Sequence, residues 1–183
     1  MFIAIHDLEQ KPVEFDVALP SGAVDYGSDI SSVTPLSARG IAELLREEQH
    51  GVASVLDIRL RGECATKLEL VCSRCLEPVP FEVNVKFDQL FRPLDASGRA
   101  GEHSISEGET EIDFYSGEGI QLEDALKEQV LLSLPSKPLC REDCRGLCVH
   151  CGANLNTVAC GCHPTTIDPR WGALASVKEK LKK

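Results

Sequence analysis

Long apolar runs are absent from this sequence of 183 residues. Its first ten residues contain no basic segment followed by an apolar stretch, so a secretory signal peptide is not predicted. No run approaches the roughly 20 apolar residues that a membrane-spanning helix needs. We therefore expect a cytoplasmic protein without membrane contact, in which cysteine side chains stay reduced.

Positive charge is also scarce, because 19 Lys and Arg stand against 29 Asp and Glu, giving a net charge of -10. A surface with this balance is unsuited to binding phosphate over its whole extent. The acidic excess is greatest between Glu102 and Glu128. That stretch is interpreted as a solvated loop or as a docking surface for a basic ligand.

Enzyme motifs are missing as well. The sequence has no His-x-Glu or His-Glu-x-x-His arrangement, no paired-carboxylate motif and no phosphate-binding glycine loop. Its five histidines are scattered along the chain and form no constellation. These absences favour a protein that is not an enzyme.

Cysteine, in contrast, is abundant: six of the nine cysteines lie between Cys140 and Cys162, with the spacing C-x3-C-x3-C-x2-C-x8-C-x-C. The Cys-x-x-Cys-Gly sequence at Cys148 is typical of a zinc knuckle, in which glycine permits a tight turn. A second pair follows eight residues later. The spacing predicts one structural Zn²⁺ site with the ligands Cys148, Cys151, Cys160 and Cys162.

Several alternatives remain open for this cluster. Disulfides and an iron–sulfur cluster use the same residue type. Cys144 could replace one of the later pair, or a two-metal cluster could use all six cysteines. His150 and His163 are interpreted as residues that do not bind the metal.

Three further cysteines lie earlier in the chain. Cys72 and Cys75 are placed at a turn between two predicted strands, where they form a second knuckle or a merely structural turn. A second knuckle lacks two ligands unless it takes them from the C-terminal six. Cys64 is in phase with the predicted buried face, so we expect a small core residue there.

The fold class predicted from hydrophobic periodicity is α+β. Short strands are expected at 2–8 and 13–19, and a helix is expected from Ser37 to about Gln49. From Val52 the period changes to two, which predicts three antiparallel strands in a meander with one buried face, with a turn at Gly62 between the first two.

Helices are expected to cover this meander. Leu122, Ala125, Leu126 and Val130 mark an amphipathic helix that ends before Pro135, and a further short strand is predicted at Ile112 and Phe114. The predicted domains are residues 1–135, an α+β domain with an antiparallel sheet, and residues 136–183, a zinc-binding module with a C-terminal helix. That helix begins at Asp168-Pro169, and it contains Trp171 beside Arg170 and a basic tail.

Several motifs closely resemble the YceD family of bacterial and plastid proteins. The resemblance rests on five short motifs: Cys72-Ser-Arg-Cys75, Leu134-Pro135, Pro138-Leu139-Cys140, Asp143 to Asn156, and Asp168-Pro169-Arg170. It runs from about Asp57 to the C-terminus. Val149 stands where a proline is common in the family.

The resemblance implies a role in processing or accumulation of large-subunit ribosomal RNA, with the gene for ribosomal protein L32 as a common bacterial neighbour. We therefore expect a non-catalytic factor in large-subunit biogenesis that promotes processing and accumulation of 23S rRNA. Ribosomal protein L32 is the first candidate partner, and a 23S rRNA precursor is the second. The alternative function is a zinc-dependent nuclease or hydrolase that acts on precursor rRNA.

Overall fold

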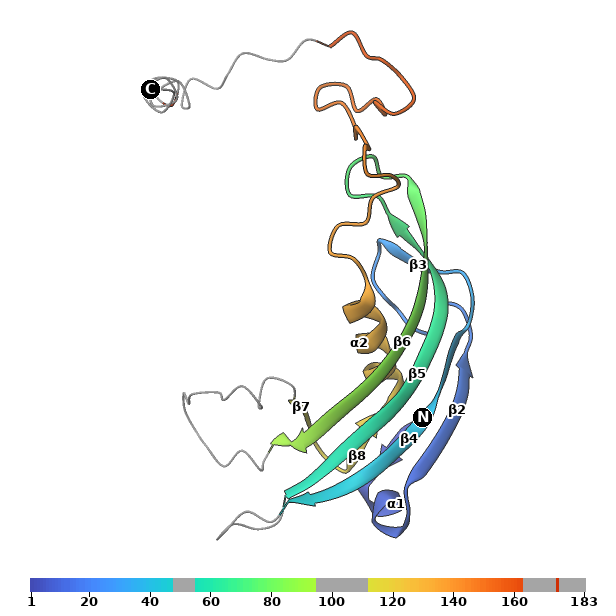
Figure 1. Ribbon diagram of the computed structural model, residues 1–183, viewed down its shortest axis with the longest axis vertical. Coiled ribbons are helices and arrows are strands. Elements are labelled where there is room, and N and C mark those ends of the chain that lie inside the picture. The colour runs from blue at the N-terminus through green and yellow to red at the C-terminus, as the bar shows by residue number, and fades with distance from the viewer. Residues whose placement is uncertain (48–54, 95–111, 163–173, 175–183) are drawn as a thin grey trace.

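The computed structural model describes residues 1–47, 55–94, 112–162 and 174. Its main element is a long, curved sheet of six strands (Figure 1). These strands are β2 (Val13–Leu19), β3 (Ile30–Ser32), β4 (Leu36–Glu47), β5 (Val55–Val71), β6 (Pro78–Pro93) and β7 (Ile112–Tyr115). A second, two-stranded sheet pairs β1 (Phe2–Ala4) with β8 (Gly119–Gln121), and the helices are α1 (Ile5–Gln10) and α2 (Leu122–Ser133).

The six-stranded sheet has the order β2-β4-β5-β6-β7, and β3 pairs with β5 beyond the end of β4. All pairings are antiparallel except that of β6 with β7. The protein is thus mostly β-sheet with few helices. An antiparallel meander is present, but its strands are β4, β5 and β6, because the two strands predicted on either side of Gly62 form the single strand β5. Strand β2 lies at one edge of the sheet and β7 at the other.

The helix expected from Ser37 to about Gln49 is wrong, because this segment forms strand β4. Ala38 and Ala42 alternate with outward residues and are buried in the core, while the backbone of β4 pairs with β2 on one side and β5 on the other. The helix was predicted because three apolar residues are spaced as on one face of a helix, namely Ile41, Leu44 and Leu45. Pairing on both edges satisfies the backbone of β4 and overrides that local signal.

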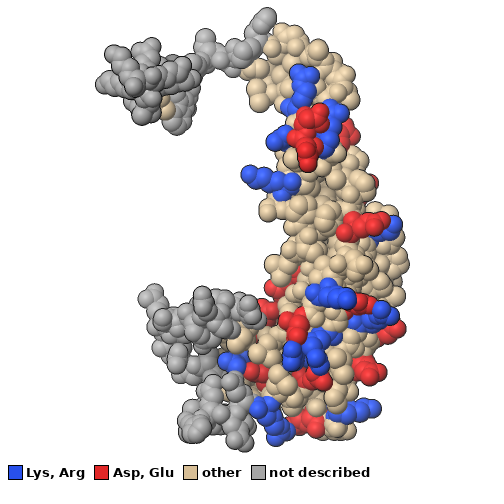
Figure 2. Space-filling model, viewed as in Figure 1, with Lys and Arg blue, Asp and Glu red and all other residues tan. Residues whose placement is uncertain are grey.

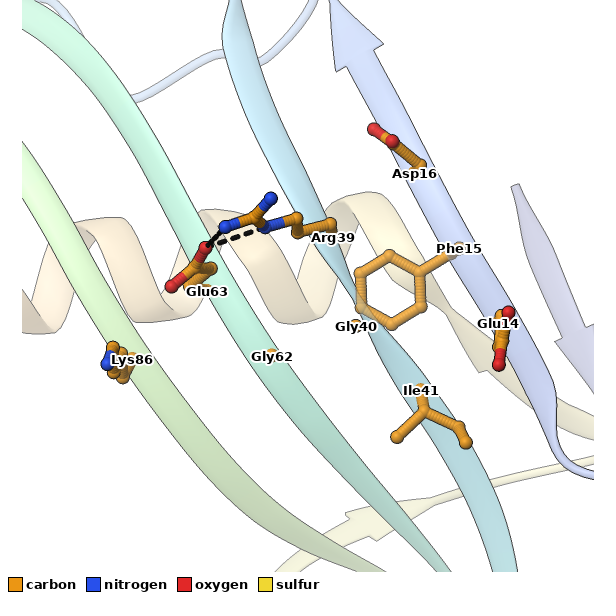
Figure 3. A pocket seen from close by; sticks show the side chains of 9 residues that line it. All are labelled: Glu14, Phe15, Asp16, Arg39, Gly40, Ile41, Gly62, Glu63 and Lys86. Carbon is orange, nitrogen blue, oxygen red and sulfur yellow. Dashed lines mark hydrogen bonds and ion pairs between the residues drawn. The ribbon is translucent and has the colours of Figure 1, made fainter.

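The predicted turn at Gly62 is also wrong, since β5 continues through it as one strand from Val55 to Val71. Gly62 instead belongs to a row of cross-strand partners, Phe15–Gly40–Gly62–Phe87. A Cβ atom on Gly40 would lie 2.6 Å from the ring of Phe15 and 2.2 Å from the carbonyl oxygen of Arg61 (Figure 3). The two glycines therefore permit a close approach of backbones and rings, of the kind that allows a sheet to curve.

Both helices pack on the same face of the sheet. Leu8 of α1 and the buried residues of α2 share one hydrophobic cluster with Ile58, Leu60 and Leu68 of β5. Helix α2 begins and ends close to its predicted limits, and β7 forms where a short strand was predicted. Cys64 is buried in this cluster, which confirms its predicted place in the core.

The opposite face of the sheet is solvated and mixed in charge, with Lys and Arg interspersed among Asp and Glu (Figure 2). Cross-strand ion pairs join Arg39 with Glu63, Arg59 with Asp88, and Lys67 with Glu82. Glu63 and Arg39 line a shallow hollow over Gly40 and Gly62. Exposed pairs of this kind contribute little to the stability of the fold, because water and salt screen them.

The N-terminal strand at 2–8 is shorter than predicted, since β1 ends at Ala4 and α1 follows. The predicted helix from Asp168 lies outside the described residues, apart from Leu174. Within the described ranges, none of the helices is both long enough and apolar enough to span a membrane.

The row of glycines leads to a prediction for stability. Gly40→Ala should lower the free energy of unfolding by about 1–3 kcal/mol, because its methyl group collides with Phe15 and with the backbone of Arg61. Urea unfolding of the full chain measures this effect. Gly161→Ala is the matched control, since a Cβ there meets no atom within 4 Å. Equal stability of the two variants would show that the close approach at Gly40 does not constrain the sheet.

Candidate metal centre

The turn between β5 and β6 carries the first pair of cysteines. The amide of Leu76 donates to the carbonyl oxygen of Cys72 at 3.0 Å, which closes the Cys72–Cys75 turn. Leu76 follows in the left-handed conformation, with φ of 63°. Backbone amides of Arg74 and Cys75 point at the sulfur of Cys72 and lower the pKa of its thiol to about 6.

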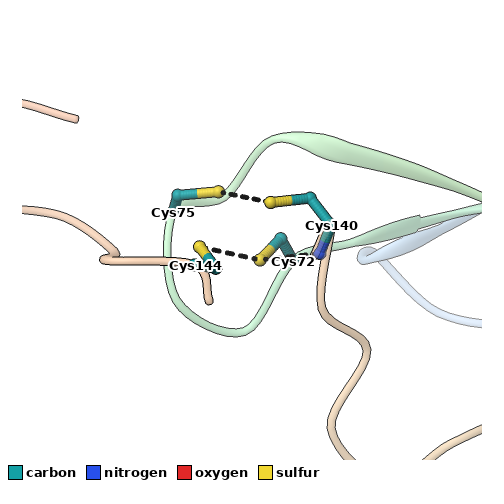
Figure 4. Close-up of side chains that lie close together, drawn as sticks. All are labelled: Cys72, Cys75, Cys140 and Cys144. Carbon is teal, nitrogen blue, oxygen red and sulfur yellow. Dashed lines mark hydrogen bonds between the residues drawn. The ribbon is translucent and has the colours of Figure 1, made fainter. Parts of the chain in front are cut away.

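The segment after α2 brings two more cysteines to this turn. The amide of Ser73 donates to the carbonyl oxygen of Pro138 at 2.9 Å, and Cys140 and Cys144 follow. Figure 4 shows the four side chains converging, with 3.9 Å between the sulfurs of Cys72 and Cys144 and 3.5 Å between those of Cys75 and Cys140. We call Cys72, Cys75, Cys140 and Cys144 the inner cluster.

The four cysteines predicted to bind zinc form a second group, in which all sulfurs lie within 4.8 Å of one another. We call Cys148, Cys151, Cys160 and Cys162 the outer cluster. The Cys148–Cys151 turn repeats the geometry of the first turn: the amide of Gly152 donates to the carbonyl oxygen of Cys148 at 2.8 Å, and Gly152 has φ of 72°. Three outer cysteines are at least partly exposed, whereas three inner ones are buried.

The thiols within each cluster influence one another. Amides of Cys151 and His150 lower the pKa of Cys148 to about 6. Neighbouring thiols, Cys75 first, raise the pKa of Cys140 to about 12, and those of Cys151 and Cys148 raise the pKa of Cys162 to about 12. Each cluster thus contains at least one thiol with a lowered pKa beside at least one with a raised pKa, and it opposes the accumulation of four negative charges until a cation neutralises them.

The structure places eight cysteines in two separate groups of four. Cys144 does not join the outer cluster, and the six C-terminal cysteines do not form one group, because Cys140 and Cys144 lie with Cys72 and Cys75. Sequence reasoning left the inner cluster open, as a second knuckle that would take two ligands from the C-terminal six, since its two halves are 65 or more positions apart. The available signal was a second Cys-x-x-Cys pair together with two C-terminal cysteines left without a role.

Four cysteine sulfurs in each cluster are a donor set that can hold a thiophilic metal ion. Such a site is closed, because four protein ligands leave no position for a reactive water. His150 is exposed, and His163 lies outside the described residues. The geometry of both clusters therefore suits structural metal ions rather than catalytic ones.

The sequence of this chain matches a known protein family. The sequence profile described as "Large ribosomal RNA subunit accumulation protein YceD" matches residues 60–178, a range that includes both clusters. The chain belongs to the YceD family. No solved structure matches it.

Relatives of this YceD protein occur in bacteria and plants. An uncharacterized protein of Mycobacterium tuberculosis is 35% identical over 136 residues, which cover 68% of this chain and 62% of that relative. The chloroplastic YCED homolog 1 of Zea mays, named as a large ribosomal RNA subunit accumulation protein, is 28% identical over 133 residues, or 60% of this chain and 45% of the relative. The matching region therefore spans less than two thirds of each relative.

The raised thiol pKa values lead to a prediction about pH. A metal ion that binds four thiolates must displace protons, including those of Cys140 and Cys162, so acid competes with the metal. The affinity of each cluster for Zn²⁺ should fall at least about tenfold for each unit of pH, since at least one proton is displaced. The fall should steepen below about pH 6, where the remaining thiolates of Cys72 and Cys148 take up protons.

Competition with a coloured chelator between about pH 8 and pH 5 measures this dependence. An affinity independent of pH over that range would contradict coordination by four cysteines.

Proposed function

We propose that this protein is a non-catalytic factor in the biogenesis of the large ribosomal subunit, which promotes processing and accumulation of 23S rRNA by binding a basic ribosomal protein. Membership of the YceD family supports the process, and the plant relatives are named as large ribosomal RNA subunit accumulation proteins. The structural observation that supports binding of a basic protein is an acidic hollow beside α2, which is lined in part by exposed aromatic side chains.

The zinc part of the proposal concerns the outer cluster. Cys148, Cys151, Cys160 and Cys162 hold one structural Zn²⁺ in a closed site of four sulfurs. Such a site supports a binding module and speaks against the nuclease alternative, which needs a metal with an open position.

The hollow lies between β7, β8 and α2 and has a volume of about 380 Å³. Asp113, Asp124 and Glu128 supply its negative charge. Phe2 and Phe114 stand at its wall with 48% and 52% of their surface exposed. Such a surface suits the long side chains of lysine and arginine. Their apolar stems can pack against the aromatic rings while their charged ends approach the carboxylates.

The electrostatics of the hollow favour a cation. Partial burial, and then the negative charge of Asp113, raise the pKa of Glu128. Within the described part of the chain, Asp113, Asp124 and Glu128 form no ion pair with a lysine or arginine. A bound basic side chain would relieve this repulsion between carboxylates.

A ribosomal protein outside the ribosome has the complementary surface, because its lysines and arginines have no RNA to neutralise them. At a net charge of -10 the protein can screen that excess and release its partner when rRNA competes. Ribosomal protein L32 is the first candidate because of the family's gene neighbourhood. Precursor 23S rRNA is the second partner, reached through the basic C-terminal tail. The acidic residues Glu102, Glu107, Glu109 and Glu111 lie outside the described residues.

A double variant tests the hollow. Asp124→Asn with Glu128→Gln should weaken the binding of purified ribosomal protein L32 by about fivefold to tenfold, since two exposed ion pairs contribute on the order of 1 kcal/mol together. Binding of the unchanged protein should also weaken steeply as salt is raised. Fluorescence anisotropy at two ionic strengths measures both effects.

The matched control is Glu14→Gln with Asp16→Asn, which removes the same charge from exposed positions on β2, at the opposite edge of the sheet. It should bind nearly as well as the unchanged protein. Equal weakening by both double variants would mean that net charge acts without a defined site. Tight binding of rRNA alone, with no binding of the ribosomal protein, would overturn the proposal.

A further inference from the structure

We infer that the inner cluster is a second structural metal site for Zn²⁺ or a similar thiophilic cation, and that it is coupled to the outer site through Asn156. This inference does not depend on the ribosomal role. It assigns a function to Cys72, Cys75, Cys140 and Cys144, which join the β5–β6 turn to the segment after α2.

The sulfur positions fit one tetrahedral ion. Four sulfurs at about 2.3 Å from a common zinc ion lie about 3.8 Å from one another. The sulfur–sulfur distances of 3.9 Å for Cys72–Cys144 and 3.5 Å for Cys75–Cys140 bracket this value. All four sulfurs lie within 4.8 Å of one another, so the arrangement needs only a small adjustment to bind a metal ion.

Buried cysteines often serve simply as small apolar core residues, as Cys64 does. The inner cluster differs because hydrogen-bond donors point at its sulfurs. The amide of Cys140 donates to Cys72 Sγ at 3.4 Å, and the side-chain amide of Asn156 donates to Cys144 Sγ at 3.2 Å. Donors of this kind stabilise thiolates, and metal sites use them around their ligands.

The two clusters share a scaffold around Arg74, which lies inside the inner knuckle. Its guanidinium donates to the carbonyl oxygen of Cys144 at 2.8 Å, and its own carbonyl oxygen accepts from the amide of Leu147 at 3.0 Å. Leu147 directly precedes Cys148, the first outer ligand. Gly146, with φ of 73°, permits this approach, because a Cβ there would lie 2.9 Å from the carbonyl oxygen of Arg74.

Asn156 connects the clusters most directly, since it belongs to the loop between the outer ligands Cys151 and Cys160. Its Oδ1 accepts from the amide of Arg145 at 2.8 Å while its Nδ2 donates to Cys144 Sγ. A metal ion in the outer site fixes this loop and thereby places the donor at the inner thiolate. Because coupling free energy is reciprocal, a metal ion in the inner site strengthens outer binding by the same factor.

Metal counting on the full chain tests the inner site. The unchanged protein, reduced and titrated with Zn²⁺ against a chelator, should bind two ions per chain. Cys148→Ser should keep one ion, and Cys148→Ser with Cys140→Ser should keep none. One ion in the unchanged protein that Cys148→Ser removes would overturn the inner site.

One ion that Cys148→Ser leaves in place would instead support the inner site while contradicting zinc in the outer cluster and any coupling between the two. Cys72→Ser would disturb a buried turn and could unfold the chain. The zinc count therefore uses substitutions of Cys148 and Cys140 instead. Both lie outside the hydrophobic core of the sheet.

The coupling is tested with Asn156→Ala. This variant keeps the eight thiols of the two clusters. It should lower the Zn²⁺ affinity of the inner site about tenfold, which is a typical effect of removing a hydrogen-bond partner of a metal ligand. Thr157→Ala is the control, since this exposed neighbour bonds only to the carbonyl oxygen of Asn154. In the background of Cys148→Ser, which leaves the inner site alone, the effect of Asn156→Ala should shrink. Equal affinities for Asn156→Ala and Thr157→Ala would overturn the coupling.

Discussion

Mutual repulsion among thiolates is the constraint on which the described cysteine-rich segment, residues 136–162, depends. Four sulfurs that converge within 4.8 Å cannot all ionise unless a cation lies among them. The backbone nevertheless aims amides at Cys72 and Cys148, so each group contains at least one thiol inclined to ionise beside at least one that resists. A metal ion removes this conflict. Within the described residues 136–162, only short turns and one isolated bridge provide regular structure, so the metal ions would supply the cohesion that a small hydrophobic core cannot.

The sheet and the cysteine-rich segment have different sources of stability, and the inner cluster joins them. The sheet is held by a core of aliphatic side chains under α2, and its glycine row lets long strands curve past one another. At one end of the sheet, the β5–β6 turn supplies two of the inner cysteines (Figure 1). This arrangement fixes the start of the cysteine-rich segment to the most regular part of the protein. The acidic hollow beside α2 and the two cysteine clusters therefore lie on one scaffold, so that a partner at one would have a defined position relative to the other.

Residue periodicity predicted the features that are local. The two-residue alternation of β5 and β6, the apolar spacing in α2 and the four outer cysteines are all visible within short windows. The errors arose where partners distant in sequence decide the structure. Leu36–Glu47 is a strand because β2 and β5 pair with both its edges, although Ile41, Leu44 and Leu45 are spaced as in a helix. Gly62 resembles a turn residue, but its role is to admit the rings and backbone of neighbouring strands. The inner cluster needed knowledge that Cys72 and Cys140 meet, which follows only from the path of the chain after α2.

X-ray absorption at the metal edge of the reduced, full-length protein tests the central claim most directly. If both clusters hold structural zinc, the spectrum is that of zinc, with a first shell that averages four sulfurs at about 2.3 Å and no nitrogen or oxygen. X-ray absorption reports the average surroundings of all the zinc ions. Since both sites would have four sulfur ligands, that average equals the first shell of each site. A first shell containing nitrogen or oxygen would show that a histidine, carboxylate or water completes at least one site. An iron edge with a short metal–metal distance would replace the two zinc ions by an iron–sulfur cluster and contradict the account.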